Sequence, residues 1–206
     1  MIIEARGILS TDKIKRLIER VKDFKGFNIY FGKMYMDKIS WIMCGASLAH
    51  HGLLGRLDTM RMDDVDLSSV PAKHLVSLTS SVRVGLCIQN VIGCDLVSIF
   101  SSLRCGTVVI NNQSLGREET RALVQHMETR EISRGLLSLK LGAEVTLDIE
   151  ALVMYSGEGA CKEIELNNST MVRYIEELRT WARSKNWEEY LAPLMLKYQT
   201  LFKRLD

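Results

Sequence analysis

One spacing of apolar residues recurs along most of this chain and constrains its fold more than any other feature. The spacing is Φ-x-x-Φ-x-Φ, where Φ is apolar, and its first position falls at residues 24, 57, 83, 105, 136 and 161. The intervals are 33, 26, 22, 31 and 25 residues, and most lie near the length of a short structural repeat. The six sets are Phe24-Phe27-Ile29, Leu57-Met60-Met62, Arg83-Leu86-Ile88, Cys105-Val108-Ile110, Leu136-Leu139-Leu141 and Cys161-Ile164-Leu166, and the third set departs from the pattern because Arg83 stands at its first position.

A polar turn and a segment with helical spacing follow each set. After Met62, for example, residues 63–68 are mostly polar, and Pro71 then suits the first turn of a helix capped by Ser68 or Ser69. A short strand, a tight turn and a helix form one unit that cannot bury its own apolar faces, so stacked neighbours must supply the core. The sequence therefore predicts an α/β fold made of repeated strand–turn–helix units.

This pattern resembles the leucine-rich repeat family. The best matches are Leu57-x-x-Met60-x-Met62, Leu136-x-x-Leu139-x-Leu141 and Cys161-x-x-Ile164-x-Leu166-Asn167-Asn168. The helical segments between the strands look like the ribonuclease-inhibitor and NOD-like-receptor subtype, and the resemblance covers about residues 24–182. It implies a leucine-rich repeat solenoid with short parallel strands on the concave side, helices on the convex side and helical ends.

The polar residue that follows each strand departs from the family pattern. The family has Asn or Cys three residues after the last strand leucine, whereas this chain places its candidates two residues after it, at Asp64, Asn90, Asn112 and Asn168. The asparagine ladder of the family is therefore either shifted by one residue here or absent.

The two ends of the chain differ from the repeated middle. Residues 11–23 have the pattern of an amphipathic helix that Ser10 or Thr11 can cap, and residues 36–51 predict a second helix. We expect a single leucine-rich-repeat-like domain over residues 1–206. Its parts would be an N-terminal helix in 1–23, about six repeats in 24–182 and a helical C-terminal cap or tail in 183–206.

Composition and charge limit the classes of partner. Hydrophobic residues make up 47% and charged residues 25% of the chain, as in an ordinary soluble globular protein. Basic residues number 27 and acidic residues 25, and this near-balance argues against a dedicated nucleic-acid surface. No run of apolar residues is long enough to span a membrane. Basic residues do gather within the first 25 positions, where acidic residues interrupt them; a solvated helix face is the favoured interpretation and a phosphate-binding patch the alternative.

Five cysteines, an odd count without a signal peptide, favour reduced thiols and a cytoplasmic location. No Cys-x-x-Cys pair points to zinc. Cys87, Cys105 and Cys161 lie within apolar patterns and are expected to be buried.

Motifs for catalysis are weak. His50-His51 precedes Gly52, as at a helix end, and the glycines at 157 and 159 lack the Gly-Lys-Ser/Thr ending of a phosphate loop. Four acidic residues between 58 and 66 fit a solvated strand-to-helix turn, with an acidic contact patch as the alternative. We therefore expect no catalytic residues, no metal site and no cofactor.

The outward positions on the predicted strands form the candidate binding surface. Equal positions of stacked parallel strands lie side by side, so polar residues at these positions would line one face of the sheet. The face is mixed in sign, which suits another protein better than a nucleic acid or a membrane. The candidate partner-binding residues are Arg61, Asp63, Gln89, Asn111, Lys140, Glu165 and Asn167.

These patterns predict a non-catalytic scaffold for protein–protein interaction. The resemblance to NOD-like receptors implies ligand sensing or autoinhibition within an innate-immune receptor-like protein. One alternative is a substrate-recruiting adaptor of a ubiquitin ligase, although no F-box-like Leu-Pro start is visible. Another is a small α/β enzyme, which would need a deep pocket with perturbed titratable groups.

Overall fold

A computed structural model describes residues 1–7, 10–130, 138–141 and 163–166, together with positions 145, 148, 176, 177, 180, 183 and 184. The chain divides into two compact units, Met1–Val108 and Val109–Asp206. Strands and helices alternate along the first unit.

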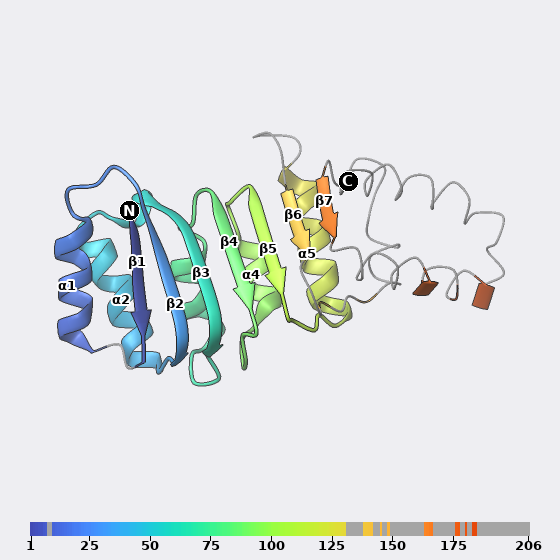
Figure 1. Cartoon of the computed structure of the whole chain (residues 1–206), viewed down its shortest axis with the longest axis horizontal. Coiled ribbons are helices and arrows are strands. Elements are labelled where there is room, and N and C mark those ends of the chain that lie inside the picture. Colours follow the sequence, from blue (N-terminus) through green and yellow to red (C-terminus); the bar gives the residue numbers. More distant parts are fainter. Residues whose placement is uncertain are drawn as a thin grey trace. The chain divides into compact units, whose positions relative to one another are not determined.

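The first unit is built on parallel strands that follow one another in chain order (Figure 1). The fifth strand begins at the end of this unit, where the Thr107 amide donates to the Val84 carbonyl at 3.0 Å. This all-parallel arrangement, with helices between the strands, confirms the predicted α/β class. The strands are β1 (Ile2–Arg6), β2 (Phe27–Tyr35), β3 (Leu57–Asp66), β4 (Gly85–Gln89) and β5 (Thr107–Asn111).

The helices of the first unit lie on one side of its sheet. In Figure 1 they are behind the strands, and the other side of the sheet is turned toward the viewer. The connection between each pair of strands carries a helix, and a 3-10 turn, η1 (Leu54–Arg56), precedes β3. The apolar sides of the helices and of the strands meet between the two layers. The helices are α1 (Thr11–Val21), α2 (Lys38–His50), α3 (Ala72–Thr79) and α4 (Leu96–Ser102).

The second unit contains the rest of β5, α5 (Arg117–Arg130), β6 (Ser138–Leu141) and β7 (Glu163–Leu166). Strands β6 and β7 are parallel. Their register pairs Leu139 with Ile164 and Leu141 with Leu166, as the repeat spacing predicts. The predicted helical tail over 183–206 lies almost wholly outside the described residues.

Local signals at the helix ends explain where the first two helices begin. Ser10 caps α1 by accepting a hydrogen bond from the Lys13 amide, as predicted. Asp37 caps α2 in the same way through the Ser40 amide at 2.9 Å, within the helix predicted over 36–51.

The predicted cap of α3 is wrong. Pro71 itself is the N-cap residue, and no side chain satisfies the first turn. Ser68 instead donates its hydroxyl to Asp66 at 2.6 Å, and Ser69 donates to the Met36 carbonyl at 3.3 Å. Both serines are therefore used to fasten the turn to the strands before the helix begins.

The core repeats from strand to strand in register. Ile29, Met60 and Leu86 are partners across β2, β3 and β4, and each is almost fully buried. Phe31, Met62 and Ile88 form the next row. Val108 and Ile110 are buried on β5 as predicted. The helical layer closes over these rows, where Trp41 contacts Phe31 with ring centroids 5.9 Å apart.

The structure corrects the first predicted set and adds a strand that the spacing did not reveal. Phe24 is 43% exposed, and β2 instead places Phe27 opposite Leu57 and Ile29 opposite Met60. The register shifts after Phe27, because β3 has one more residue than β2 over this stretch. The earlier strand, β1, pairs in parallel with β2 from Ile2 opposite Asn28 to Arg6 opposite Gly32.

A backbone bend recurs at one register position of successive strands. Arg6, Gly32, Asp63 and Gln89 are register partners, and the residue after each has a positive φ. Asn112 has the same conformation directly after β5. Asn, Asp and Gly adopt this left-handed region most easily. The φ angles are 70° at Gly7, 50° at Lys33, 53° at Asp64, 47° at Asn90 and 44° at Asn112.

Truncation of one core residue tests this packing. We expect Leu86→Ala to lower the free energy of unfolding by about 2–5 kcal/mol, because it removes buried methyl groups and leaves a cavity. The matched control, Gln89→Ala, lies on the opposite face of the same strand and should cost less than about 0.5 kcal/mol. Urea denaturation gives both values, and equal effects of the two changes would contradict the assignment of faces.

The bend at Lys33 gives a second test. Lys33 is exposed and has a φ of 50°, where a side chain with a Cβ is strained by about 1–2 kcal/mol. Lys33→Gly should therefore leave the melting temperature unchanged or raise it, whereas Lys33→Val should lower it, because a β-branched residue tolerates this conformation poorly. Thermal unfolding followed by circular dichroism measures both. A Val variant as stable as the Gly variant would show that residue 33 does not bend in this way.

Candidate binding surface on the open face of the sheet

The side of the sheet opposite the helices carries two rows of mostly polar residues. The register pairs Glu4 with Tyr30, Tyr30 with Arg61, and Arg61 with Cys87. The row beside it contains the partners Arg6, Gly32, Asp63 and Gln89. We call Arg6, Tyr30, Gly32, Arg61 and Asp63 the open-face cluster.

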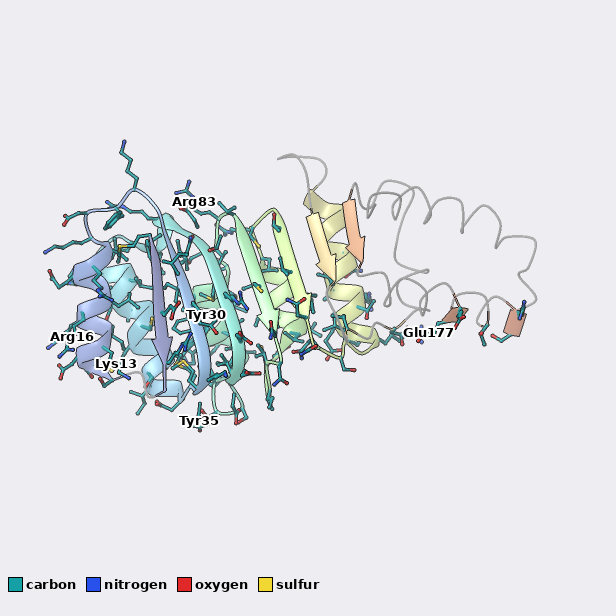
Figure 2. The ribbon with its side chains drawn as sticks, in the orientation of Figure 1. Lys13, Arg16, Tyr30, Tyr35, Arg83 and Glu177 are labelled. Atoms are coloured by element: carbon teal, nitrogen blue, oxygen red, sulfur yellow. The ribbon has the colours of Figure 1, made fainter. Side chains whose placement is uncertain are left out.

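Tyr30 is the centre of the open-face cluster. Its ring lies 5.8 Å from the Arg6 guanidinium carbon and 5.4 Å from that of Arg61, within the range of cation–π attraction. Its hydroxyl donates to Asp63 Oδ2 at 3.0 Å. Figure 2 labels Tyr30 over β2 and β3, on the face turned away from the helices.

Gly32 makes room for this ring. A Cβ at position 32 would lie 2.6 Å from both Cζ and the hydroxyl oxygen of Tyr30. The tyrosine therefore crosses the sheet directly above a residue that has no side chain. Because side chains of a β-strand alternate in direction, positions 30 and 32 lie on the same face of the sheet.

Asp63 is a carboxylate that the cluster satisfies on one oxygen. Its Oδ2 accepts from the Tyr30 hydroxyl and lies 3.3 Å from Arg61 Nη2. Its Oδ1 is buried and has no hydrogen-bond partner among the described residues, and the residue as a whole is 9% exposed. A buried acceptor without a partner is costly, so a donor arriving at Oδ1 would be favoured.

The environment shifts the pKa of two groups in this region. Burial raises the pKa of the Tyr30 hydroxyl, and its hydrogen bond to Asp63 adds to the rise. Burial also raises the pKa of the Cys87 thiol, against the opposing effect of Arg61. A thiol held protonated is a poor nucleophile. This arrangement therefore supplies hydrogen bonds and charge for binding, and neither group is activated for covalent chemistry.

The structure brings some of the predicted partner-binding residues together. Asp63 and Gln89 are register partners, and Arg61 is bonded to Asp63. In the second unit, Lys140 and Glu165 are register partners on β6 and β7. Asn111 ends β5, and Asn167 lies outside the described residues.

Arg6 and Tyr30 belong to this surface but were not among the residues predicted from the sequence. Arg6 was missed because β1 was not predicted. The spacing of the first two predicted sets places Tyr30 level with Asp63, whereas the structure pairs Tyr30 with Arg61. The sequence does contain one signal for this cluster, the glycine two residues after Tyr30. That spacing indicates a tyrosine lying over a glycine only once the strand register is known.

The four clustered aspartates do not form one acidic turn, which corrects both interpretations drawn from the sequence. Asp58 lies 3.8 Å from Arg83 Nη1, Asp63 belongs to the open-face cluster, and Asp64 accepts from Asn90 at 2.7 Å. Asp66 accepts from Ser68. Three of the four lie within β3 before its last residue, so alternation along the strand and the bend at Asp64 send them to separate partners.

The remaining candidates have structural roles or gather no ligands. His50 ends α2 and His51 caps it, followed by Gly52 with a φ of 64°, as predicted for a helix end. In the described part of the chain, no three His, Cys, Asp or Glu side chains lie close enough to hold a metal ion. Among the same residues, no helix is both long and apolar enough to cross a membrane.

Comparisons with protein-family models, with curated proteins and with solved structures found no match to this chain.

The Tyr30–Asp63 hydrogen bond predicts a pH dependence. Because folding raises the pKa of Tyr30, its contribution to stability is fully present below the unfolded value near 10 and is lost as the pH rises through the folded value. Wild type should therefore be more stable than Tyr30→Phe at neutral pH, and the difference should shrink above about pH 10. Urea denaturation at a series of pH values measures it.

The control is Tyr35→Phe, which changes an exposed tyrosine at the end of β2. It should leave the free energy of unfolding nearly unchanged at neutral pH. If Tyr30→Phe has as little effect as this control, the hydroxyl of Tyr30 is not bonded to Asp63 in solution.

Proposed function

We propose that this protein is a non-catalytic interaction scaffold that binds another protein through the open face of its parallel sheet. The observation that carries the proposal is the open-face cluster, in which a tyrosine lies between two arginines over a glycine. Tyrosine and arginine are, with tryptophan, the residue types enriched among those that dominate binding energy at protein interfaces. A rigid sheet also lowers the entropy cost of holding such side chains in place.

The polar groups of the cluster suit a protein partner. Arg61 is half exposed and offers donors, while Asp63 offers an acceptor that has no partner within the described residues. Donors and acceptors of both signs thus lie side by side. A partner with matching groups would gain specificity from them, whereas a polyanion would meet the buried carboxylate.

The arrangement of the repeated units supports the finer assignment to a leucine-rich repeat solenoid. Consecutive strands are neighbours and parallel, and consecutive connections place their helices on one side of the sheet. Asn90 donates to Asp64 between neighbouring strands at the recurrent bend, which favours a ladder shifted by one residue over its absence. In such a solenoid the open face would be concave.

The resemblance to NOD-like receptors suggests that the surface senses a ligand within an innate-immune receptor-like protein. A substrate-recruiting adaptor of a ubiquitin ligase would use the same face. We place the interaction in the cytoplasm, because the chain has an odd number of cysteines, five, which favours reduced thiols.

Site-specific photo-crosslinking tests this function. A photo-reactive amino acid at Gln89, on the open face, should capture a discrete partner from an extract of the source cells. The same group at Lys73, which is exposed on α3, should not capture that partner. Introducing Arg61→Ala should lower the yield of the Gln89 crosslink at least tenfold, because it removes a guanidinium from the cluster.

Two controls make the outcome decisive. Arg61→Ala should leave the melting temperature within a few degrees of wild type, since Asp63 still accepts from Tyr30. Lys73→Ala should leave the crosslink yield unchanged. Capture of the same protein from position 73, or capture that is indifferent to Arg61, would overturn the proposal.

A further inference from the structure

The outer edge of β1 lies beside a groove lined largely by basic side chains. The groove has a volume of about 250 Å³. Strand β1 supplies one side and α1 supplies the other. Its lining residues are Glu4, Ala5, Arg6, Lys13, Arg16, Leu17 and Arg20.

The basic residues of α1 are spaced to follow the strand. Lys13, Arg16 and Arg20 recur every three or four residues, which places them on one side of a helix. Their side is distinct from the buried side of α1, which includes Ile14 and Ile18. Figure 2 shows Lys13 and Arg16 projecting from this helix.

The groove carries a net positive charge. Its one acidic residue, Glu4, forms an ion pair with Arg6 at 3.4 Å. A second depression adjoins the groove and shares Arg16 and Arg20 with it, and Lys15 and Glu19 complete its lining. Glu19 is paired there with Lys22. An anionic occupant would therefore meet three helical cations along the groove.

Strand β1 also offers backbone hydrogen-bonding groups at this edge. It is the first strand of the sheet, and β2 is its neighbour on one side. The Met1 carbonyl accepts from the Asn28 amide of β2 at 2.8 Å. Because backbone groups alternate along a strand, the N–H and C=O groups of Ile2, Glu4 and Arg6 face the other way.

One contact within the described residues confirms this direction. Lys13 Nζ of α1 donates to the Arg6 carbonyl at 3.3 Å, on the side away from β2. An edge strand with unpaired backbone groups is a template for a further strand. Main-chain bonds would give such a strand affinity, and its side chains would give specificity.

We propose that this groove binds an acidic, extended peptide segment of a partner protein, which adds to β1 as a further strand. Carboxylates of the segment pair with Lys13, Arg16 and Arg20, while its backbone bonds to the free edge at Ile2 and Glu4. The inference concerns a surface at the edge of the sheet, which shares Arg6 with the open-face cluster but binds its occupant through the cations of α1 and the backbone of β1.

The groove favours a peptide over a nucleic acid. The described residues that line it include no aromatic side chain, so bases would find no platform there on which to stack. The N–H and C=O groups of Ile2 and Glu4 that face away from β2, in contrast, complement a peptide backbone.

Fluorescence anisotropy with a labelled peptide of alternating threonine and glutamate tests the proposal on the full chain. We expect saturable binding to wild type and at least tenfold weaker binding to Arg16→Glu combined with Arg20→Glu. The matched control is Lys25→Glu combined with Lys73→Glu, which changes the net charge equally at exposed positions outside the groove and should bind as wild type does.

The strand-addition step is tested separately from charge. The same peptide with N-methyl groups on alternate amides keeps every carboxylate but loses the N–H donors along one edge of the extended strand. Its affinity should therefore fall at least tenfold. Glu4→Pro removes a backbone donor from the free edge, and it should weaken binding even though it also removes a negative charge from the groove. Circular dichroism checks that this variant is folded.

Three results would overturn the proposal. The first is equal binding of the N-methylated and unmodified peptides, which would indicate charge attraction alone. The second is equal loss of affinity in the control pair at 25 and 73. The third is tighter binding of a labelled oligothymidylate than of the acidic peptide, which would assign the groove to nucleic acid.

Discussion

The parallel register of β1 to β4 is the constraint on which the rest of the first unit depends. It places Ile29, Met60 and Leu86 in one buried row and Phe31, Met62 and Ile88 in the next. A slip of one residue would turn these side chains out of the core and bring polar ones into it. The bend that follows the register row of Gly32 and Asp63 repeats at the same level on neighbouring strands.

The binding surface follows from the same register. With helices on one side of the sheet, the alternate residues are left on the other, and the register decides which of them meet. Tyr30 can reach Asp63 on the next strand because Gly32, directly beneath its ring, is the register partner of Asp63. The guanidiniums of Arg6 and Arg61 come from the strands on either side of β2. Three strands thus build a cluster that none of them contains alone.

Much of the fold was predictable because burial on one face gives each strand a period that the sequence displays. The sets beginning at Leu57, Arg83 and Cys105 coincide with β3, β4 and β5. The first set was misplaced by two residues, because it began at Phe24, which lies before β2, and so matched Phe27 with Met60, whereas the structure pairs Ile29 with Met60. Strand β1 was missed because only two of its residues, Ile3 and Ala5, are register partners of the buried Ile29 and Phe31, too few for a periodic signal.

The site was less predictable than the fold. Arg61, Asp63 and Gln89 could be placed on one surface, since equal positions of neighbouring repeats must stack. Their grouping with Tyr30 depends on a pairing that crosses 31 positions from residue 30 to residue 61. The absence of a side chain at Gly32 acquires meaning only once that pairing is known.

Cross-linking between neighbouring strands tests the register most directly. The structure pairs position 61 with Cys87, so Arg61→Cys should form a disulfide with Cys87 under mild oxidation. Thr59→Cys lies on the same face but two residues away along the strand, and it should react with Cys87 far more slowly. Mass spectrometry of proteolytic fragments identifies the linked peptides. A faster link from position 59 than from position 61 would contradict the register and, with it, the composition of the open-face cluster.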